Sequence, residues 1–339
     1  MNKQINVGIV GFGKMGILHA GILNALPGCK VIAICETEPL VRKIASKALP
    51  KVRFYERPFE MATGEDLDAV YVTTPIPSHV SVVKELARSG MRFGLFVEKP
   101  LAGTTQDAQL IVEEAPKFVT TDMIGFQKRF LPQFIRAKEL LDKGALGRVI
   151  SFHGYSFLAS VFSKGRGWRF RKVGGGALLD LGPHLIDLVA WYFGKPSLVT
   201  ASESSMYSEE VEDCAKVGFE FDSGFSGRIE VSWSKEGYRL PETGMDVIGS
   251  NGTLRVTDDA LELGIKEEVP GVARAGRLSL SRPEMLHGVE FLLGDPEYCL
   301  EDGQFLSALR GGNPDSPRFD DGLEVNRIIE LAHAAAGLR

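Results

Sequence analysis

The sequence predicts an α/β protein of two parts: an N-terminal doubly wound, parallel-sheet Rossmann domain and a C-terminal α+β domain with a large open-faced, mainly antiparallel sheet. Three observations lead to this prediction. Strands and helices alternate over the first third of the chain, polar and apolar residues alternate further on, and 339 residues exceed the length at which one hydrophobic core normally stops growing. We therefore expect domains at residues 1–124 and 125–339.

Apolar runs at Ile5–Val10, Val31–Cys35, Ala69–Thr73 and Phe93–Val97 mark the predicted strands of the first domain. Helical patterns follow them at Lys14–Leu26, Leu40–Ala48, His79–Ser89 and Thr105–Glu113. The strands are rich in Val and Ile with little polar alternation, which is typical of a parallel sheet buried on both faces. Strand–helix alternation at this spacing predicts βαβ units.

The pattern changes after about Gly125. Helices are expected over Leu131–Leu141 and Leu178–Phe193, and period-2 segments such as Ala215–Phe221 and Ser226–Trp233 read as strands. Such alternation indicates a sheet with one buried face and one open face. A tail helix is expected over about residues 322–336, in a position to pack back on the first domain.

Composition and charge exclude several classes of partner. The formal net charge of −5 does not favour nucleic acid or an anionic membrane surface as a partner. The four cysteines have neither zinc-site nor disulfide spacing, and the N-terminus lacks the apolar core of a signal peptide. No run approaches the roughly 20 apolar residues of a membrane span. We expect a cytoplasmic protein with a small-molecule partner.

A glycine-rich segment, Gly11-Phe12-Gly13-Lys14-Met15-Gly16, directly follows the first strand and opens the first helix. The first glycine permits the tight turn, the second lets the backbone approach a pyrophosphate, and the third lets helix and strand pack closely. The free N–H groups and the dipole of the helix N-terminus favour the anion. The segment predicts a dinucleotide site.

Glu36 ends the second strand, where an acidic side chain can accept hydrogen bonds from the adenine ribose hydroxyls and repel a 2′-phosphate. Thr37 follows it, and the nearest arginine is Arg42. The sequence therefore favours NAD, with NADP less favoured. The alternative is that Glu36 is only a solvated charge at a strand end.

Several further motifs resemble the Gfo/Idh/MocA family, the relatives of glucose–fructose oxidoreductase and inositol dehydrogenase. They are Val97-Glu98-Lys99-Pro100-Leu101 after the strand at 93–97, Thr73-Thr74-Pro75 with Ser78-His79, the run Gly125–Phe130, and the run Gly174–Asp187. The resemblance extends from the glycine loop to about Phe193. Beyond residue 200 only the strand pattern and the helical tail agree.

The resemblance implies the catalytic residues Lys99, His184 and Asp180. An ammonium beside the reacting oxygen stabilises alkoxide character and can pass on a proton. His184 is implied as the general base, which suits a group that titrates near neutral pH. Asp180 would bind a substrate hydroxyl or orient His184, and Asp187 shares their helix face by spacing. Because proline is disfavoured inside a helix, we expect Pro183 to start the regular helix.

The resemblance also implies the rest of the site. Glu98 would anchor the Lys99 turn. The cofactor-binding residues are then Gly11, Phe12, Gly13, Lys14, Met15, Gly16, Glu36, Thr37, Thr73, Thr74, Pro75, His79, Glu98, Lys99 and Gln127. The substrate-binding residues are Lys99, Arg129, Trp168, Arg169, Asp180 and His184. No metal is expected, because His153, His184 and His287 have no ligand spacing.

The loop Arg166–Lys172 carries four cations beside two aromatic residues. It could line a sugar pocket or bind a phosphate, or it could be a solvated basic loop. The sequence leaves these alternatives open.

These residues predict an NAD-dependent oxidoreductase that transfers a hydride between the nicotinamide and a carbinol or keto carbon of a sugar, inositol or nucleotide sugar. Two alternatives stay open at this point: an NAD-retaining glycoside hydrolase acting by oxidation and elimination, and a catalytically silent sugar-sensing regulator. The family resemblance implies a homodimer or homotetramer formed through the open sheet face.

Overall fold

A computed structural model describes residues 4–172, 174–286, 296–312 and 316–337. The chain forms two compact units that interleave along the sequence. The first comprises Met1–Phe126 with Gly294–Asn326, and the second comprises Gln127–Leu293 with Arg327–Arg339. The first change of unit, after Phe126, lies two residues beyond the predicted boundary between residues 124 and 125, and residues 294–326 belong to the first unit again.

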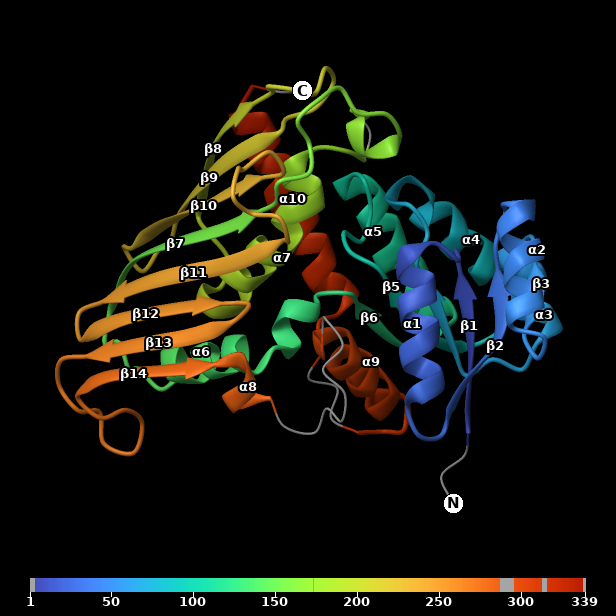
Figure 1. The fold of residues 1–339 in the computed structure, drawn as a ribbon, viewed down its shortest axis with the longest axis horizontal. Helices are drawn as coiled ribbons and strands as arrows, with labels where there is room; N and C mark the ends of the chain where they lie inside the picture. The colour runs from blue at the N-terminus through green and yellow to red at the C-terminus, as the bar shows by residue number, and fades with distance from the viewer. Residues whose placement is uncertain (1–3, 173, 287–295, 313–315, 338–339) are drawn as a thin grey trace. The chain divides into compact units, whose positions relative to one another are not determined.

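The first unit contains a six-stranded sheet with the order β3-β2-β1-β4-β5-β6 (Figure 1). All neighbouring strands are parallel. The strands are β1 (Ile5–Val10), β2 (Cys29–Cys35), β3 (Arg53–Tyr55), β4 (Ala69–Val72), β5 (Phe93–Val97) and β6 (Val119–Ile124). Every residue of β4 and β5 is buried, which explains their unbroken apolar runs. The order is that of the doubly wound Rossmann fold, as predicted.

The helices of this unit are α1 (Lys14–Ala25), α2 (Pro39–Ala48), α3 (Pro58–Gly64), α4 (His79–Arg88), α5 (Thr105–Glu114) and α9 (Pro296–Leu309). The sequence pattern did not predict β3, β6, α3 or α9. Strand β3 is only three residues long, and β6 is a partly exposed strand at the sheet edge. Helix α9 packs on α1, a contact between segments far apart in sequence that no local pattern indicates.

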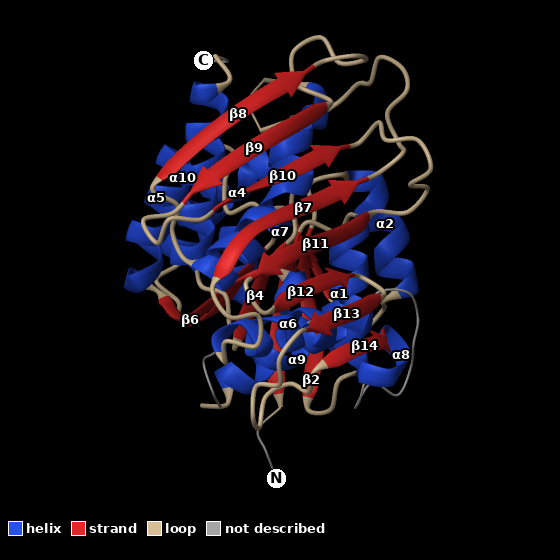
Figure 2. Ribbon diagram, turned by 90° about the vertical axis from the view of Figure 1, so that its left-hand side faces the viewer, coloured by secondary structure: helices blue, strands red, loops and turns tan. Residues whose placement is uncertain are grey.

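The second unit contains an eight-stranded sheet with the order β14-β13-β12-β11-β7-β10-β9-β8 (Figure 2). The strands are β7 (Val149–Phe157), β8 (Leu198–Ser204), β9 (Cys214–Glu220), β10 (Ser226–Ser232), β11 (Glu242–Gly249), β12 (Gly252–Thr257), β13 (Ala260–Ile265) and β14 (Gly276–Ser281). Only β7 and β10 pair in parallel, so the sheet is mainly antiparallel, as predicted. In β9 the side chains of Ala215, Val217 and Phe219 are buried while Lys216 and Glu220 are exposed.

Helices α6 (Pro132–Asp142) and α7 (Ala177–Phe193) pack on this sheet, and α8 (Arg282–Met285) follows β14. The expectation for Pro183 was wrong, because α7 already begins at Ala177 and runs through the proline. An internal proline removes one backbone hydrogen bond and costs about 3 kcal/mol or more. Thirteen residues of α7, Pro183 included, are buried, and this packing overrides the local cost.

The predicted tail helix corresponds to α10 (Phe319–Ala335), which contributes residues to both units. No helix in the described ranges has both the length and the apolar character required to cross a bilayer.

Candidate active site

The glycine loop between β1 and α1 has the geometry that its three glycines predict. Gly11 has a φ of +91°, and a side chain there would lie 2.9 Å from the backbone nitrogen of Thr74. A Cβ at Gly16 would lie 2.1 Å from the carbonyl oxygen of Gly11, so helix and loop are in contact there. A Cβ at Gly13 would meet nothing within 4 Å. The approach to the helix start is therefore open at Gly13, the side where a pyrophosphate would lie.

The start of α1 also fits an anion. Gly13 is its N-cap, and no side chain of the described residues caps the helix or places an acid in its first turn. Its orphan N–H groups and its dipole suit a phosphate. Lys14 is exposed and Met15 half-buried in the first turn.

The carboxylate of Glu36 is tied to this loop. One oxygen accepts a hydrogen bond from the amide of Phe12 at 2.7 Å, and the other from the amide of Glu38 at 2.9 Å. The guanidinium of Arg42 donates to the carbonyl oxygens of Glu36 and Thr37 and pairs with Glu56. Glu36 is thus held beside the glycine loop, and Arg42 is committed to other acceptors.

The segment after β4 supports the same loop. The hydroxyl of Thr73 donates to the carbonyl oxygen of Gly11 at 2.7 Å. The buried hydroxyl oxygen of Thr74 has no hydrogen-bond partner among the described residues. The ring nitrogens of buried His79 lie 2.9 and 3.1 Å from the carbonyl oxygens of Thr74 and Leu101. His79 therefore bridges two loops, while the adjacent Pro75 is exposed.

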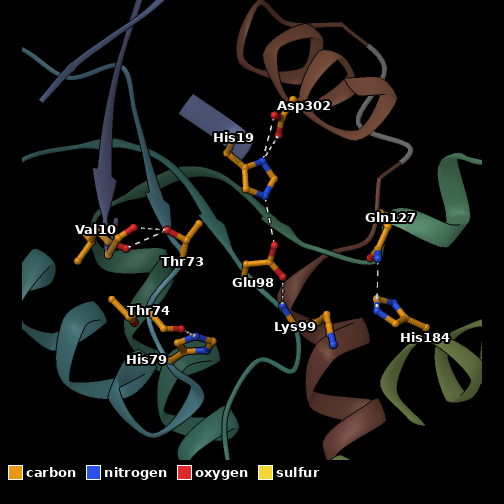
Figure 3. Close-up of polar contacts among 11 residues, drawn as sticks. Val10, His19, Thr73, Thr74, His79, Glu98, Lys99, Gln127, His184 and Asp302 are labelled. Carbon is orange, nitrogen blue, oxygen red and sulfur yellow. Dashed lines mark hydrogen bonds and ion pairs between the residues drawn. The ribbon is translucent and has the colours of Figure 1, made fainter. Parts of the chain in front are cut away.

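The turn that carries Lys99 follows β5, and its peptide bond to Pro100 is cis. One carboxylate oxygen of Glu98 accepts a hydrogen bond from the amide of Lys99 at 3.0 Å. The other lies 3.2 Å from Nε2 of His19 on α1, and Nδ1 of that ring lies 2.9 Å from Asp302 on α9 (Figure 3). The sequence predicted Glu98 as the anchor of the turn but gave no sign of His19 or Asp302.

In the second unit, α7 carries the predicted acid–base group. His184 is 7% exposed, and its Nε2 lies 3.4 Å from the side-chain nitrogen of Gln127, which lies in the 3₁₀ turn Gln127–Phe130 (Figure 3). Asp180, one turn earlier on the helix, forms an ion pair with Arg169. The structure thus brings together Gln127 and His184, and separately Asp180 and Arg169, as neighbours in this unit.

Arg129 makes an ion pair that the sequence did not predict. Its Nε and Nη2 donate to the two carboxylate oxygens of Asp187 at 2.8 and 2.5 Å, and its guanidinium lies 5.6 Å from the ring centre of Trp191. Asp187 is 1% exposed, and a carboxylate can be buried only if it is paired and hydrogen-bonded. The guanidinium of Arg129 provides both the opposite charge and the hydrogen bonds. The two acids of α7 therefore both carry arginine partners.

The basic loop of residues 166–172 lies against acidic residues of the same unit. Arg171 pairs with Glu210 at 2.8 Å, and Arg169 pairs with Asp180 and lies over the ring of Trp233. Trp168 is half-buried at the start of the 3₁₀ turn Trp168–Phe170. These pairings give the loop a structural role beside the start of α7.

The start of α7 is held by the segment before β9. The amide of Leu178 donates to the carboxylate of Glu212 at 2.7 Å, and the amide of Ala177 donates to the carbonyl oxygen of Glu212 at 3.0 Å. Burial raises the pKa of Glu212 to about 7. These two hydrogen bonds to Glu212 therefore fix the N-terminus of the helix that carries Asp180 and His184.

Among the residues that the structure describes, two groups of histidine and carboxylate side chains lie close enough to share a cation: His19 with Glu301 and Asp302, and Glu203 with Glu212 and His333. Neither includes His153 or His184, and His287 lies outside the described residues. Each group contains a hydrogen bond between its own members, from His19 to Asp302 in the first group and from His333 to Glu203 in the second.

Comparison with known proteins is consistent with this geometry. Residues 5–125 match the model described as the oxidoreductase family, NAD-binding Rossmann fold, and residues 134–255 match the GFO/IDH/MocA C-terminal domain. Together the two models cover more than half of the chain.

Two curated relatives are informative. The scyllo-inositol 2-dehydrogenase (NAD(+)) of Bacillus subtilis is 27% identical over 75% of this chain and 74% of its own length. The levoglucosan dehydrogenase of Pseudarthrobacter phenanthrenivorans is 29% identical over 97% of this chain and 96% of its own. A solved levoglucosan dehydrogenase, in complex with NADH and levoglucosan, shares the fold with a TM-score of 0.86 at 24% identity, over 98% of this chain and 97% of that one.

The fold and the glycine loop define an oxidoreductase with an NAD-binding Rossmann domain. More particularly, the chain belongs to the Gfo/Idh/MocA family, as its motifs predicted.

The contact at Gly16 generates a prediction. Gly16→Ala should weaken NADH binding at least tenfold, about 1.4 kcal/mol, because the new methyl group would displace the loop carbonyl that it meets. Gly21→Ala is the matched control, since a Cβ at that position of the same helix meets nothing within 4 Å. The control should bind NADH normally and gain up to about 1 kcal/mol of stability. Fluorescence titration and thermal unfolding measure both, and equal NADH affinities would show that the close contact is dispensable.

Proposed function

We propose that the protein is an NAD-dependent dehydrogenase that oxidises one carbinol carbon of a sugar or inositol. The observation that carries the proposal is the position of three segments at the carboxyl ends of neighbouring strands. The glycine loop, Thr73 and the Lys99 turn follow β1, β4 and β5, which are adjacent strands of the parallel sheet. Ligands of such sheets bind outside the carboxyl ends of the strands. Lys99 therefore follows a strand at the same end of the sheet as the glycine loop, where we propose that the pyrophosphate binds.

Residues of the first unit fit the dinucleotide. The open backbone at Gly13, the uncapped start of α1 and the hydroxyl of Thr74 suit its phosphates and neighbouring polar groups, and Glu36 suits the adenine ribose. When bound, NAD supplies the hydride acceptor of the reaction.

Lys99 and His184 supply the proton chemistry in this proposal. The Lys99 ammonium stabilises the alkoxide that develops on the substrate oxygen. The imidazole of His184 accepts the hydroxyl proton as the carbinol carbon becomes a ketone. Asp180, paired with Arg169, holds a substrate hydroxyl through its remaining acceptor capacity. Trp168, Arg129 and Gln127 shape and support this side of the site.

The relatives support a cyclic polyol as substrate, since their names record dehydrogenases of scyllo-inositol and levoglucosan. They give no support to a glycoside hydrolase or a silent regulator. The pairing of Arg169 and Arg171 with acids favours a neutral sugar over a phosphorylated one. A homodimer or homotetramer formed through the open sheet face belongs to the same proposal.

The direct test is NADH formation from a panel of inositols, aldoses, levoglucosan, sugar phosphates and nucleotide sugars. The proposal expects a neutral cyclic polyol to give the highest kcat/KM, with one NADH formed per ketone. Cleavage of a glycoside without net NADH would contradict it.

Glu36 determines the choice of cofactor in this proposal. NAD should bind at least tenfold more tightly than NADP, worth about 1.4 kcal/mol, because the carboxylate repels a 2′-phosphate. Glu36→Gln should narrow the ratio of the two affinities, since the amide keeps one of the two acceptor oxygens but loses the charge. Calorimetric titration of both cofactors measures this. Equal affinities for the unchanged protein would remove Glu36 from the role.

Lys99→Met should lower kcat by roughly a hundredfold or more, the usual scale for losing a proton-transfer or electrostatic group. NADH affinity should change little, because the glycine loop and Glu36 are intact. Lys99→Arg keeps the charge but loses a group able to release its proton, so it separates the two contributions. Near-normal turnover of the methionine variant would make the lysine structural.

His184→Ala should remove most of the turnover and the pH dependence that belongs to the base. Oxidation requires neutral imidazole, so the rate should rise with pH through an apparent pKa and be lost as pH falls below it. His153→Ala, at a half-buried position of β7, is the control and should keep the profile. A folded His184→Ala protein with an unchanged profile would leave Lys99 as the proton acceptor.

A further inference from the structure

We propose that His19 is a positioning residue for the active-site turn: it holds the carboxylate of Glu98, and through Glu98 the backbone of Lys99, against Asp302 of α9. The inference deepens the proposed function and rests on the role given there to Lys99. Nothing in the sequence motif around Lys99 points to a residue of α1 or α9.

The contacts form one continuous chain. Asp302 oxygens lie 2.9 and 3.0 Å from Nδ1 of His19, Nε2 of His19 lies 3.2 Å from Glu98, and the second Glu98 oxygen accepts the Lys99 amide at 3.0 Å (Figure 3). His19 and Asp302 are fully buried, and Glu98 is 8% exposed. All belong to the first unit.

The partners of His19 determine its charge state. Both ring nitrogens face carboxylate oxygens, and only the imidazolium carries a donor on each nitrogen. Burial by itself would lower the pKa of His19, but the charges and hydrogen bonds of Asp302 and Glu98 outweigh it and raise that pKa well above 6.5. The rings of Phe96, Tyr71 and Tyr298 also face His19, with centroids 5.1, 5.3 and 5.9 Å from its own. Glu301 lies beside it as well, and burial raises the pKa of Glu301 well above its usual range.

The imidazolium compensates the buried charge of Glu98. A carboxylate removed from water is costly unless it is paired and hydrogen-bonded. One Glu98 oxygen has the Lys99 amide, and the other depends on His19. Without that donor the carboxylate would turn away from β5 toward water, and the amide of Lys99 would lose its acceptor.

Two substitutions separate positioning from packing. His19→Asn places an amide nitrogen near the position of Nδ1 and keeps the donor to Asp302, whereas His19→Gln reaches the position of Nε2 and keeps the donor to Glu98. Both are neutral and close in size, so their effects on packing are matched. The NAD-bound proteins are compared by hydrogen exchange of the Lys99 amide and by steady-state kinetics with the best substrate of the panel.

The proposal expects the Lys99 amide of His19→Asn to exchange at least tenfold faster than in the unchanged protein, and that of His19→Gln to change much less. The kcat of His19→Asn should fall about tenfold to a hundredfold with KM nearly constant, because a misplaced group acts on the transition state. Equal exchange in the two variants would overturn the proposal. If the two variants differ in exchange of the Lys99 amide but have equal kcat, the result would support the positioning by His19 and count against the catalytic role of Lys99.

A measurement on the unchanged protein keeps the test valid if the variants do not fold. The protein has six histidines, whose side-chain nitrogens can be followed by ¹⁵N NMR. One ring, identified as His19 by its couplings, should remain doubly protonated at pH 8. A neutral His19 ring at that pH would overturn the proposal.

Discussion

The candidate site depends on one buried carboxylate, that of Glu98. It lies at the end of β5, where the chain leaves the sheet, and it needs donors because water cannot reach it freely. The amide of Lys99 and the ring of His19 supply them. Gly125 packs so closely that a Cβ there would lie 3.2 Å from the carboxylate. We infer that the buried carboxylate of Glu98 fixes the direction of the turn that carries Lys99.

The sequence predicts well what short-range physics determines. Buried parallel strands are continuous apolar runs. The glycine loop needs Gly16 for a contact within a few residues and Gly11 for a contact with one neighbouring loop. It does not predict contacts made across long separations. His19 meets Asp302 across 283 residues, and Arg129 meets Asp187 across 58. No local periodicity marks such pairs, and the sequence does not reveal which residue will be the partner of a given acid or arginine.

Helix α7 shows both results in one element. The spacing of Asp180, His184 and Asp187 correctly places them on one helical face. The same reasoning failed at Pro183, because burial of the helix outweighs the lost hydrogen bond. Arginines from two other segments, Arg169 and Arg129, neutralise the two acids. We propose the histidine between them as the proton acceptor of this face.

In the proposed reaction, hydride passes directly from a substrate carbinol carbon to the nicotinamide. The most direct measurement uses the preferred polyol with deuterium on its carbinol carbons and follows the NADH formed by proton NMR. We expect one deuterium at C4 of the nicotinamide of each NADH, and a slower reaction if hydride transfer limits the rate. NADH without deuterium, or product formed with no NADH, would contradict it.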